Sequence, residues 1–197
     1  MTGSRRLGQA ISEGDGISVL VDVAAVDAAR EAEAQGAEGL ALRLPVAGVR
    51  EATTLPVLFR GGISPDDARD AGADAWLLVA EDLHEEGDEL EELYARALEI
   101  GLECVVDVRD DEELQLVLER LDPEIVLLSP REAEEAEEAL DRILELLPDV
   151  PAGKLAVAEL AMATREEVVA LERAGVDAVL VGAGNVAELV GAAPPKV

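Results

Sequence analysis

The sequence has few of the residues that several common functions require. Among its 197 residues are one cysteine, one histidine and three aromatic residues, and 16 Lys plus Arg stand against 44 Asp plus Glu, a formal net charge of −28. Because phosphate backbones are bound by clustered cations, this charge excludes a general nucleic-acid binder. Phe59, Trp76 and Tyr94 supply no stacking platform for single-stranded nucleic acid or for sugar rings.

The scarce cysteine and histidine exclude two further kinds of site. Cys104 has no partner within the chain for a disulfide or a thiolate metal cluster, and its apolar surroundings predict a small buried side chain. His84 stands beside Glu85 and Glu86 without a second histidine at ligand spacing, which favours a solvated loop residue. We therefore predict no metal site.

The chain also lacks a long apolar run. No stretch approaches the roughly 18 apolar residues that a membrane span needs, and the first residues contain no apolar signal-peptide core. The sequence therefore predicts a cytoplasmic protein without a membrane segment.

Short apolar runs, rich in β-branched residues, alternate along the chain with charged stretches of helical period. The predicted strands are Ile17–Val23, Gly39–Leu44, Pro56–Arg60, Ala75–Ala80, Glu103–Val108, Ile125–Ser129, Leu155–Glu159 and Ala178–Val181. The predicted helices are Val26–Gln35, Val46–Ala52, Pro65–Ala71, Gly87–Ile100, Asp111–Leu121, Arg131–Leu147, Arg165–Ala174 and Asn185–Val190.

This alternation predicts an α/β fold of eight strand–helix units, a (β/α)₈ TIM barrel near the lower length limit of roughly 200 residues. We expect one domain over residues 1–197, with a lead-in at 1–16 and a tail at 192–197. An open doubly wound sheet uses the same alternation, but Val23–Val26 lacks the glycine-rich turn that usually follows its first strand.

Local signals for helix ends agree with the repeat. Glycine follows four predicted helices, at Gly36, Gly72, Gly101 and Gly175. Ser64 and Thr164 precede acidic first turns and are predicted N-caps. Residues 71–79 and 174–182 also resemble each other, an echo of the repeating unit.

Active sites of such barrels lie at the carboxyl ends of the strands, so the residues that close the apolar runs are the candidates. They are Asp22, Arg43, Arg60, Glu81, Asp107, Arg109, Ser129, Arg131 and Glu159. The four arginines predict a positive island suited to phosphate or carboxylate. The alternative is that these arginines pair with Asp22, Asp107 and Glu159.

Two glycine-bearing turns are candidates for phosphate binding through backbone amides. Gly182, Ala183 and Gly184 precede Asn185 after the last strand, and Gly61-Gly62-Ile63-Ser64 follows the third. Both sets of glycines are equally compatible with plain turns.

Few groups are expected to be available for acid–base chemistry at the mouth of the barrel, the end where the carboxyl ends of the strands lie. Asp107 and Glu159 are expected to face each other as a general acid and base, or to serve as counter-ions of the arginines. Lys154 precedes the seventh strand and Lys196 lies in the tail, so neither lysine is expected at the rim, which excludes a Schiff-base mechanism.

Four segments, with their order and spacing, resemble the indole-3-glycerol phosphate synthase family. They are residues 55–58, 71–78, 97–110 and 174–182, which read LPVL, AGADAWLL, ALEIGLECVVDVRD and AGVDAVLVG. The resemblance implies a (β/α)₈ barrel that closes and decarboxylates an anthranilate-derived deoxyribulose phosphate to give the indole of tryptophan biosynthesis. It also implies that no cofactor is used.

The resemblance assigns the catalytic positions to Arg60, where the family has its strand-three general-acid lysine, to Asp107 and to Glu159. It places Asp22-Val23-Ala24 where the family has Glu-Ile-Lys, and Leu128-Ser129-Pro130-Arg131 where it has Asn-Asn-Arg-Asp. The predicted ligand- and phosphate-binding residues are Asp22, Arg43, Arg109, Ser129, Arg131, Gly182, Ala183 and Gly184. The family's extra helix before strand one, which helps to cover the mouth, is expected to be absent.

The leading hypothesis is a shortened, divergent member of this family that binds a small phosphorylated or carboxylated ligand. Without the two lysines, indole formation is not expected. The alternatives are a catalytically silent scaffold or partner subunit, and a phosphosugar isomerase or epimerase that uses Asp107 and Glu159. The expected partner is a small anionic metabolite, and the expected state is a monomer or weak homo-oligomer.

Overall fold

Eight parallel strands close into a barrel in chain order, with β8 paired to β1. The computed structural model describes residues 6–14, 16–80, 89–130, 136–184 and 186–190. The strands are β1 (Ser18–Asp22), β2 (Gly39–Leu42), β3 (Val57–Phe59), β4 (Ala75–Val79), β5 (Glu103–Val108), β6 (Ile125–Leu128), β7 (Leu155–Leu160) and β8 (Ala178–Gly182). The predicted (β/α)₈ barrel is confirmed and the open sheet is excluded.

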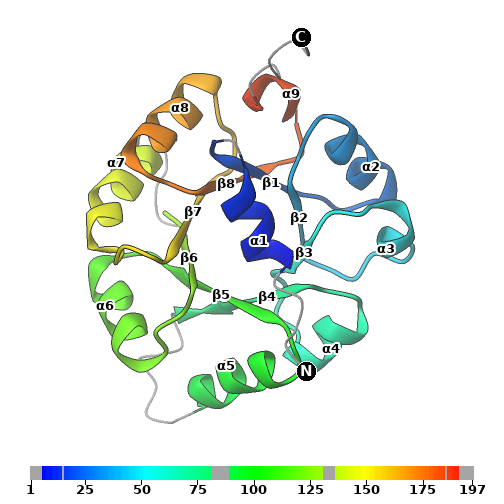
Figure 1. Cartoon of the computed structure of the whole chain (residues 1–197), viewed down its shortest axis with the longest axis horizontal. Helices are drawn as coiled ribbons and strands as arrows, with labels where there is room; N and C mark the ends of the chain where they lie inside the picture. The colour runs from blue at the N-terminus through cyan, green and yellow to red at the C-terminus, as the bar shows by residue number, and fades with distance from the viewer. Residues whose placement is uncertain (1–5, 15, 81–88, 131–135, 185, 191–197) are drawn as a thin grey trace.

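Helices follow the strands and surround the barrel (Figure 1). They are α2 (Val26–Ala34), α3 (Val49–Ala52), α4 (Pro65–Asp70), α5 (Glu89–Glu99), α6 (Asp111–Arg120), α7 (Ala136–Leu146), α8 (Arg165–Ala174) and α9 (Val186–Leu189), and a 3₁₀ turn, η2 (Leu147–Asp149), follows α7. The helix α3 begins later than predicted because Gly48, at φ 82°, interrupts the helical backbone before Val49.

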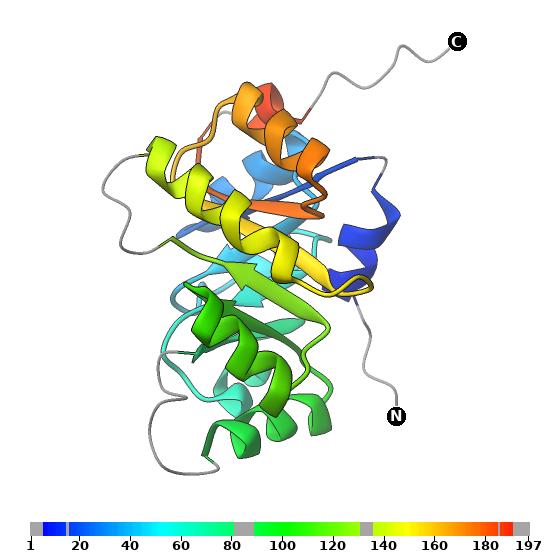
Figure 2. The ribbon, with the colours of Figure 1, turned by 90° about the vertical axis from the view of Figure 1, so that its left-hand side faces the viewer.

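A further helix, α1 (Arg6–Glu13), precedes the first strand and lies within the lead-in, where no helix was predicted. It lies across the centre of the strand ring in Figure 1 and at one end of the barrel in Figure 2. The carboxylate of Glu103, the first residue of β5, accepts hydrogen bonds from the amides of Leu7 (2.7 Å) and Gly8 (2.9 Å). Since strands begin at this end, α1 closes the end opposite the predicted mouth.

Alternate strand residues form the core inside the barrel. The inner cluster combines Leu7 and Ile11 of α1 with strand residues Leu20, Ala41, Leu58, Ala75, Leu77, Val105, Ile125, Leu127, Val157, Ala178 and Leu180. The intervening strand residues pack with the helices in a second cluster. Because side chains alternate along a strand, the residues two positions beyond this inner layer also face inward. They form the next layer toward the mouth.

The predicted helix ends have the expected geometry. Gly36, Gly72, Gly101 and Gly175 have φ between 84° and 102°, the left-handed region that favours glycine after a helix. The Ser64 hydroxyl accepts from the Asp67 amide, and Thr164 with Glu167 forms a complete capping box.

The sequence echo corresponds to one repeated structural device. Asp74, before β4, accepts the amide hydrogen of Val57 at 2.9 Å, and Asp177, before β8, accepts that of Ala156 at 2.8 Å. Each aspartate therefore ties its own strand to the start of the preceding strand.

Two observations concern the single cysteine and the predicted lack of a membrane segment. Cys104 is buried, as predicted, and burial raises the pKa of its thiol. In the part of the chain that the structure describes, no helix has both the length and the apolar character of a membrane span.

Candidate functional site

The inward-facing layer at the carboxyl ends of the strands contains an ion network centred on Arg60. Its Nη2 atom lies 2.5 Å from Oε1 of Glu159, and its Nη1 atom lies 3.6 Å from Oδ2 of Asp22. The Arg60 side chain is only 7% exposed, against 18% for Asp22 and 20% for Glu159. Arg60 thus occupies the mouth with a carboxylate on either side, contributed by β1 and β7.

Arg43 extends this network at the outer edge of the mouth. Its Nε atom donates to Oδ2 of Asp22 at 2.9 Å, so both arginines approach the same carboxylate oxygen. The Arg43 side chain is 66% exposed. Its guanidinium is therefore the more accessible of the two.

Asp107 and Ser129 form a second polar pair, on the neighbouring strand ends of β5 and β6. The Ser129 hydroxyl donates to Oδ1 of Asp107 at 2.5 Å, and both residues are buried. Two predicted site residues are therefore in direct contact beneath the mouth.

Arg109 is held by Glu113, a residue that the sequence analysis did not single out. Oε2 of Glu113 accepts the Arg109 amide hydrogen at 2.9 Å, Oε1 accepts from Arg109 Nε at 2.9 Å, and Nη2 also contacts this carboxylate. The carboxylate is buried in the first turn of α6. Glu113 stands in the first turn of the helix that follows the strand end, so its closeness to Arg109 in the sequence was the signal available.

Of the four arginines in the predicted positive island, the structure describes Arg43, Arg60 and Arg109. Arg43, Arg60 and Arg109 each ion-pair with an acid. These three arginines accompany four carboxylates, those of Asp22, Asp107, Glu113 and Glu159. The alternative of arginines paired with rim acids describes Arg43 and Arg60 correctly. Arg131 and Glu81, also predicted at the rim, and His84 lie outside the described residues.

The two glycine-bearing turns differ in their packing. After β8, the Gly182 amide donates to the Ala161 carbonyl at 3.3 Å, and Ala183 and Gly184 are exposed. After β3, a Cβ on Gly61 would stand 2.0 Å from the Arg43 carbonyl oxygen, so this glycine has a packing role. The Ile63 carbonyl accepts from Trp76 Nε1 at 2.9 Å, which ties the second turn to β4.

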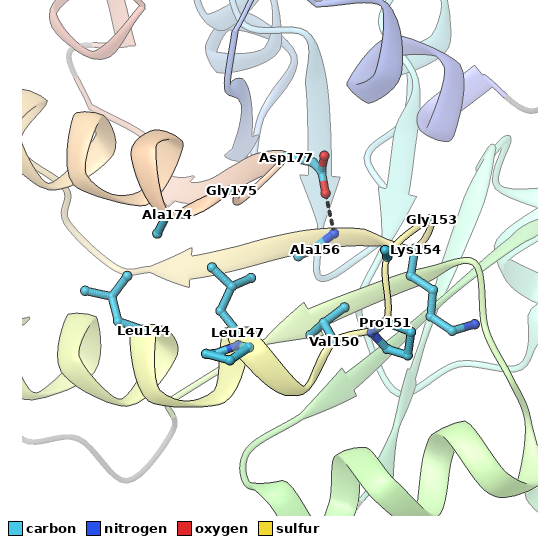
Figure 3. A pocket seen from close by; sticks show the side chains of 12 residues that line it. Leu144, Leu147, Val150, Pro151, Gly153, Lys154, Ala156, Ala174, Gly175 and Asp177 are labelled. Atoms are coloured by element: carbon cyan, nitrogen blue, oxygen red, sulfur yellow. Dashed lines mark hydrogen bonds between the residues drawn. The ribbon is translucent and has the colours of Figure 1, made fainter.

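A cavity of about 560 Å³ lies at the other end of the barrel, among α7, η2, β7 and the start of β8 (Figure 3). Leu144, Leu147, Val150 and Pro151 supply apolar lining. Lys154, also in the lining, donates to Asp122 at 2.6 Å and to the Pro123 carbonyl at 2.7 Å. Its ammonium group is therefore already held by the protein, and we assign the cavity no chemistry.

Comparison with known proteins is consistent with this geometry. A family model described as indole-3-glycerol phosphate synthase matches residues 46–188. The indole-3-glycerol phosphate synthase of Geobacillus sp. (strain WCH70) is 33% identical over 172 residues, which are 85% of this chain and 61% of that protein. The enzyme of the same name from Acidithiobacillus ferrooxidans (strain ATCC 53993 / BNL-5-31) is 38% identical over 143 residues, 71% of this chain and 53% of that protein.

A solved structure shares the fold. The N-acetylmannosamine-6-phosphate 2-epimerase from Clostridium perfringens superimposes with a TM-score of 0.70 at 16% identity, covering 87% of this chain and 88% of that one. At this identity the likeness shows the fold alone. The chain spans between half and two thirds of the length of the curated relatives. Because the family match covers most of the chain, the chain belongs to the indole-3-glycerol phosphate synthase family.

Proposed function

We propose that this chain binds a small phosphorylated or carboxylated ligand at the carboxyl-end mouth of the barrel and does not catalyse indole formation. The observation that carries the proposal is the place of Arg60. It stands where the family resemblance puts the general-acid lysine, and it is held between Glu159 and Asp22 with 7% of its side chain exposed.

An arginine in this position changes the available chemistry. A guanidinium holds its proton so firmly that it is a poor proton donor near neutral pH. A guanidinium does bind carboxylate and phosphate oxygens through two parallel hydrogen bonds. Arg60 is therefore suited to recognition and orientation rather than to protonation of a substrate.

The strand-one position points the same way. Ala24, an exposed residue beyond β1, stands where the resemblance places the family's second lysine. The chain has only two lysines, Lys154 and Lys196, and Lys154 lies at the start of β7, the opposite end from the mouth. Two groups that the resemblance associates with indole formation are thus replaced.

Features of the mouth that favour ligand binding are the exposed guanidinium of Arg43 and the turn that follows β8. Arg43 needs only to exchange its contact with Asp22 to reach an anion. Gly182, Ala183 and Gly184 place backbone groups at the same end of the barrel, where such barrels often bind phosphate.

Two measurements test the proposal. The family's anthranilate-derived substrate is added to the purified protein and indole fluorescence is followed between about pH 6 and 9, with the Geobacillus relative as the positive control. We expect no turnover, and indole production above background would disprove the loss of activity.

Isothermal titration calorimetry with inorganic phosphate and with propionate tests binding. We expect saturable binding of at least one probe, weakened about tenfold or more in Arg43→Gln. Arg30→Gln is the matched control, since Arg30 is an exposed arginine of α2 paired with Asp27. If no small carboxylate or phosphate probe binds, the protein is better described as the catalytically silent scaffold, an alternative that the ion pairs of Arg60 with Glu159 and Asp22 favour.

A further inference from the structure

The contacts of Arg60 restrict which ligand can use it. Both of its ion-pair partners are acids, Glu159 at 2.5 Å and Asp22 at 3.6 Å, and all three side chains are largely buried. A ligand carboxylate that takes two parallel hydrogen bonds from Nη1 and Nη2 therefore competes with Asp22 and, more directly, with the closer Glu159.

For a purely anionic ligand, this exchange is energetically unfavourable. Once it takes Arg60, Glu159 keeps its negative charge in a partly buried position without its counter-ion, which is the costly way to open an ion pair. The exchange also takes place within a chain of net charge −28. A phosphate group would add up to two further negative charges to this field.

A ligand with both charges avoids that cost. Its carboxylate replaces Glu159 as the partner of Arg60, and its ammonium group pairs with the released Glu159, so each buried charge keeps a counter-ion. We infer that the mouth selects a small zwitterionic ligand, with one carboxylate for Arg60 and one ammonium group for Glu159. This inference rests on the proposed binding function and names the chemical class of the ligand.

Arg43 supplies the second half of the carboxylate clamp. It approaches the same Oδ2 atom of Asp22 as Arg60 does, and it is 66% exposed. The Asp22 carboxylate thus lies between two guanidinium groups. A ligand carboxylate entering beside it meets donors from both β2 and β3 ends, an arrangement that fixes its orientation.

The test compares β-alanine with propionate, which has the same carbon chain and carboxylate but no amine. Both are titrated into the whole protein by calorimetry at low ionic strength, together with inorganic phosphate. We expect β-alanine to bind at least tenfold more tightly than propionate, and phosphate to bind no better than propionate.

A variant locates the preference. Glu159→Gln keeps the shape of the side chain but removes the charge that the ammonium group needs, so the ratio of the two affinities should fall to about one. Glu166→Gln, an exposed acid in the first turn of α8 at the same end of the barrel, makes the same charge change and should keep the ratio. Circular dichroism confirms that both variants are folded.

The outcomes separate this inference from the proposed function. If propionate or phosphate binds as tightly as β-alanine, the inferred preference for a zwitterionic ligand is overturned, while the proposed binding of a small anion is supported. A preference that survives in Glu159→Gln also overturns it. Failure of all three probes to bind overturns both proposals.

Discussion

Arg60 and Glu159 form an ion pair across the barrel, with 2.5 Å between Nη2 and Oε1. Arg60 directly follows β3, and Glu159 lies within β7. These two strands are four apart in the closed barrel and therefore on opposite sides of the ring. The pair thus links the two halves of the mouth directly, rather than through neighbouring strands.

Breaking this pair should cost stability. Arg60→Met leaves Glu159 without its partner in a partly buried position, and we expect a loss of about 1–3 kcal/mol in the free energy of unfolding by urea. In the double variant with Glu159→Gln, the combined loss should be smaller than the sum of the single losses.

The exposed pair Arg30 and Asp27 provides the control for that measurement. Their side chains are 59% and 95% exposed, so Arg30→Met should change stability by less than about 0.5 kcal/mol. Equal effects at the two sites would show that the pair across the mouth contributes no more than a solvated one.

The sequence predicted which residues lie at the candidate site, but not how they pair. The period of the strands placed Asp22, Arg60, Asp107 and Glu159 at one end of the barrel, and the structure shows that end as predicted. It left open which charges pair, because Arg60 and Glu159 are 99 positions apart and any acid at the rim was an equally good partner.

The helix α1 was missed for a related reason. Its local signal is short, with only Leu7 and Ile11 buried over eight residues. Its first amides bind the carboxylate of Glu103, about 95 positions away, so this stabilisation is tertiary and invisible to a local pattern. Helix caps such as Thr164 with Glu167 were predictable because the interacting groups are three residues apart.

Removal of the Glu103 carboxylate should loosen α1. Glu103→Ala deprives the amides of Leu7 and Gly8 of their acceptor. We expect the free energy of unfolding to fall by about 1–2 kcal/mol. Hydrogen exchange measured by mass spectrometry should become faster in peptides from residues 6–13. Unchanged protection there would contradict the capping role, and Glu112→Ala, an exposed acid of α6, is the control.

Gly61 should not tolerate a side chain. Its added Cβ would stand 2.0 Å from the Arg43 carbonyl oxygen, so Gly61→Ala must displace main chain next to a mouth arginine. We expect the free energy of unfolding to fall by about 2–4 kcal/mol, and any ligand that uses Arg43 to bind more weakly.

The adjacent glycine is the matched control. A Cβ on Gly62 meets no atom within 4 Å, and the substitution Gly62→Ala should change stability by less than about 0.5 kcal/mol. Similar losses at both positions would mean that chain flexibility, rather than the approach to Arg43, requires glycine in this turn.

The pH dependence of stability has a spectroscopic marker in the single tyrosine. Desolvation by burial, followed by the effect of neighbouring Cys104, raises the pKa of Tyr94 from its ordinary value of 10.0 to about 12. A phenolate titration followed by absorbance near 295 nm reports this residue alone, because the chain has one tyrosine. Its midpoint should lie well above that of the urea-unfolded chain.

The sign of the stability effect follows from the direction of the shift. The folded chain holds the phenol proton more tightly than the unfolded chain, so the contribution of Tyr94 is complete below pH 10 and is lost as the pH rises toward 12. Tyr94→Phe cannot ionise and should lose less stability between pH 9 and 11 than the parent chain. Identical losses in the two proteins over that interval would place the alkaline instability in other groups.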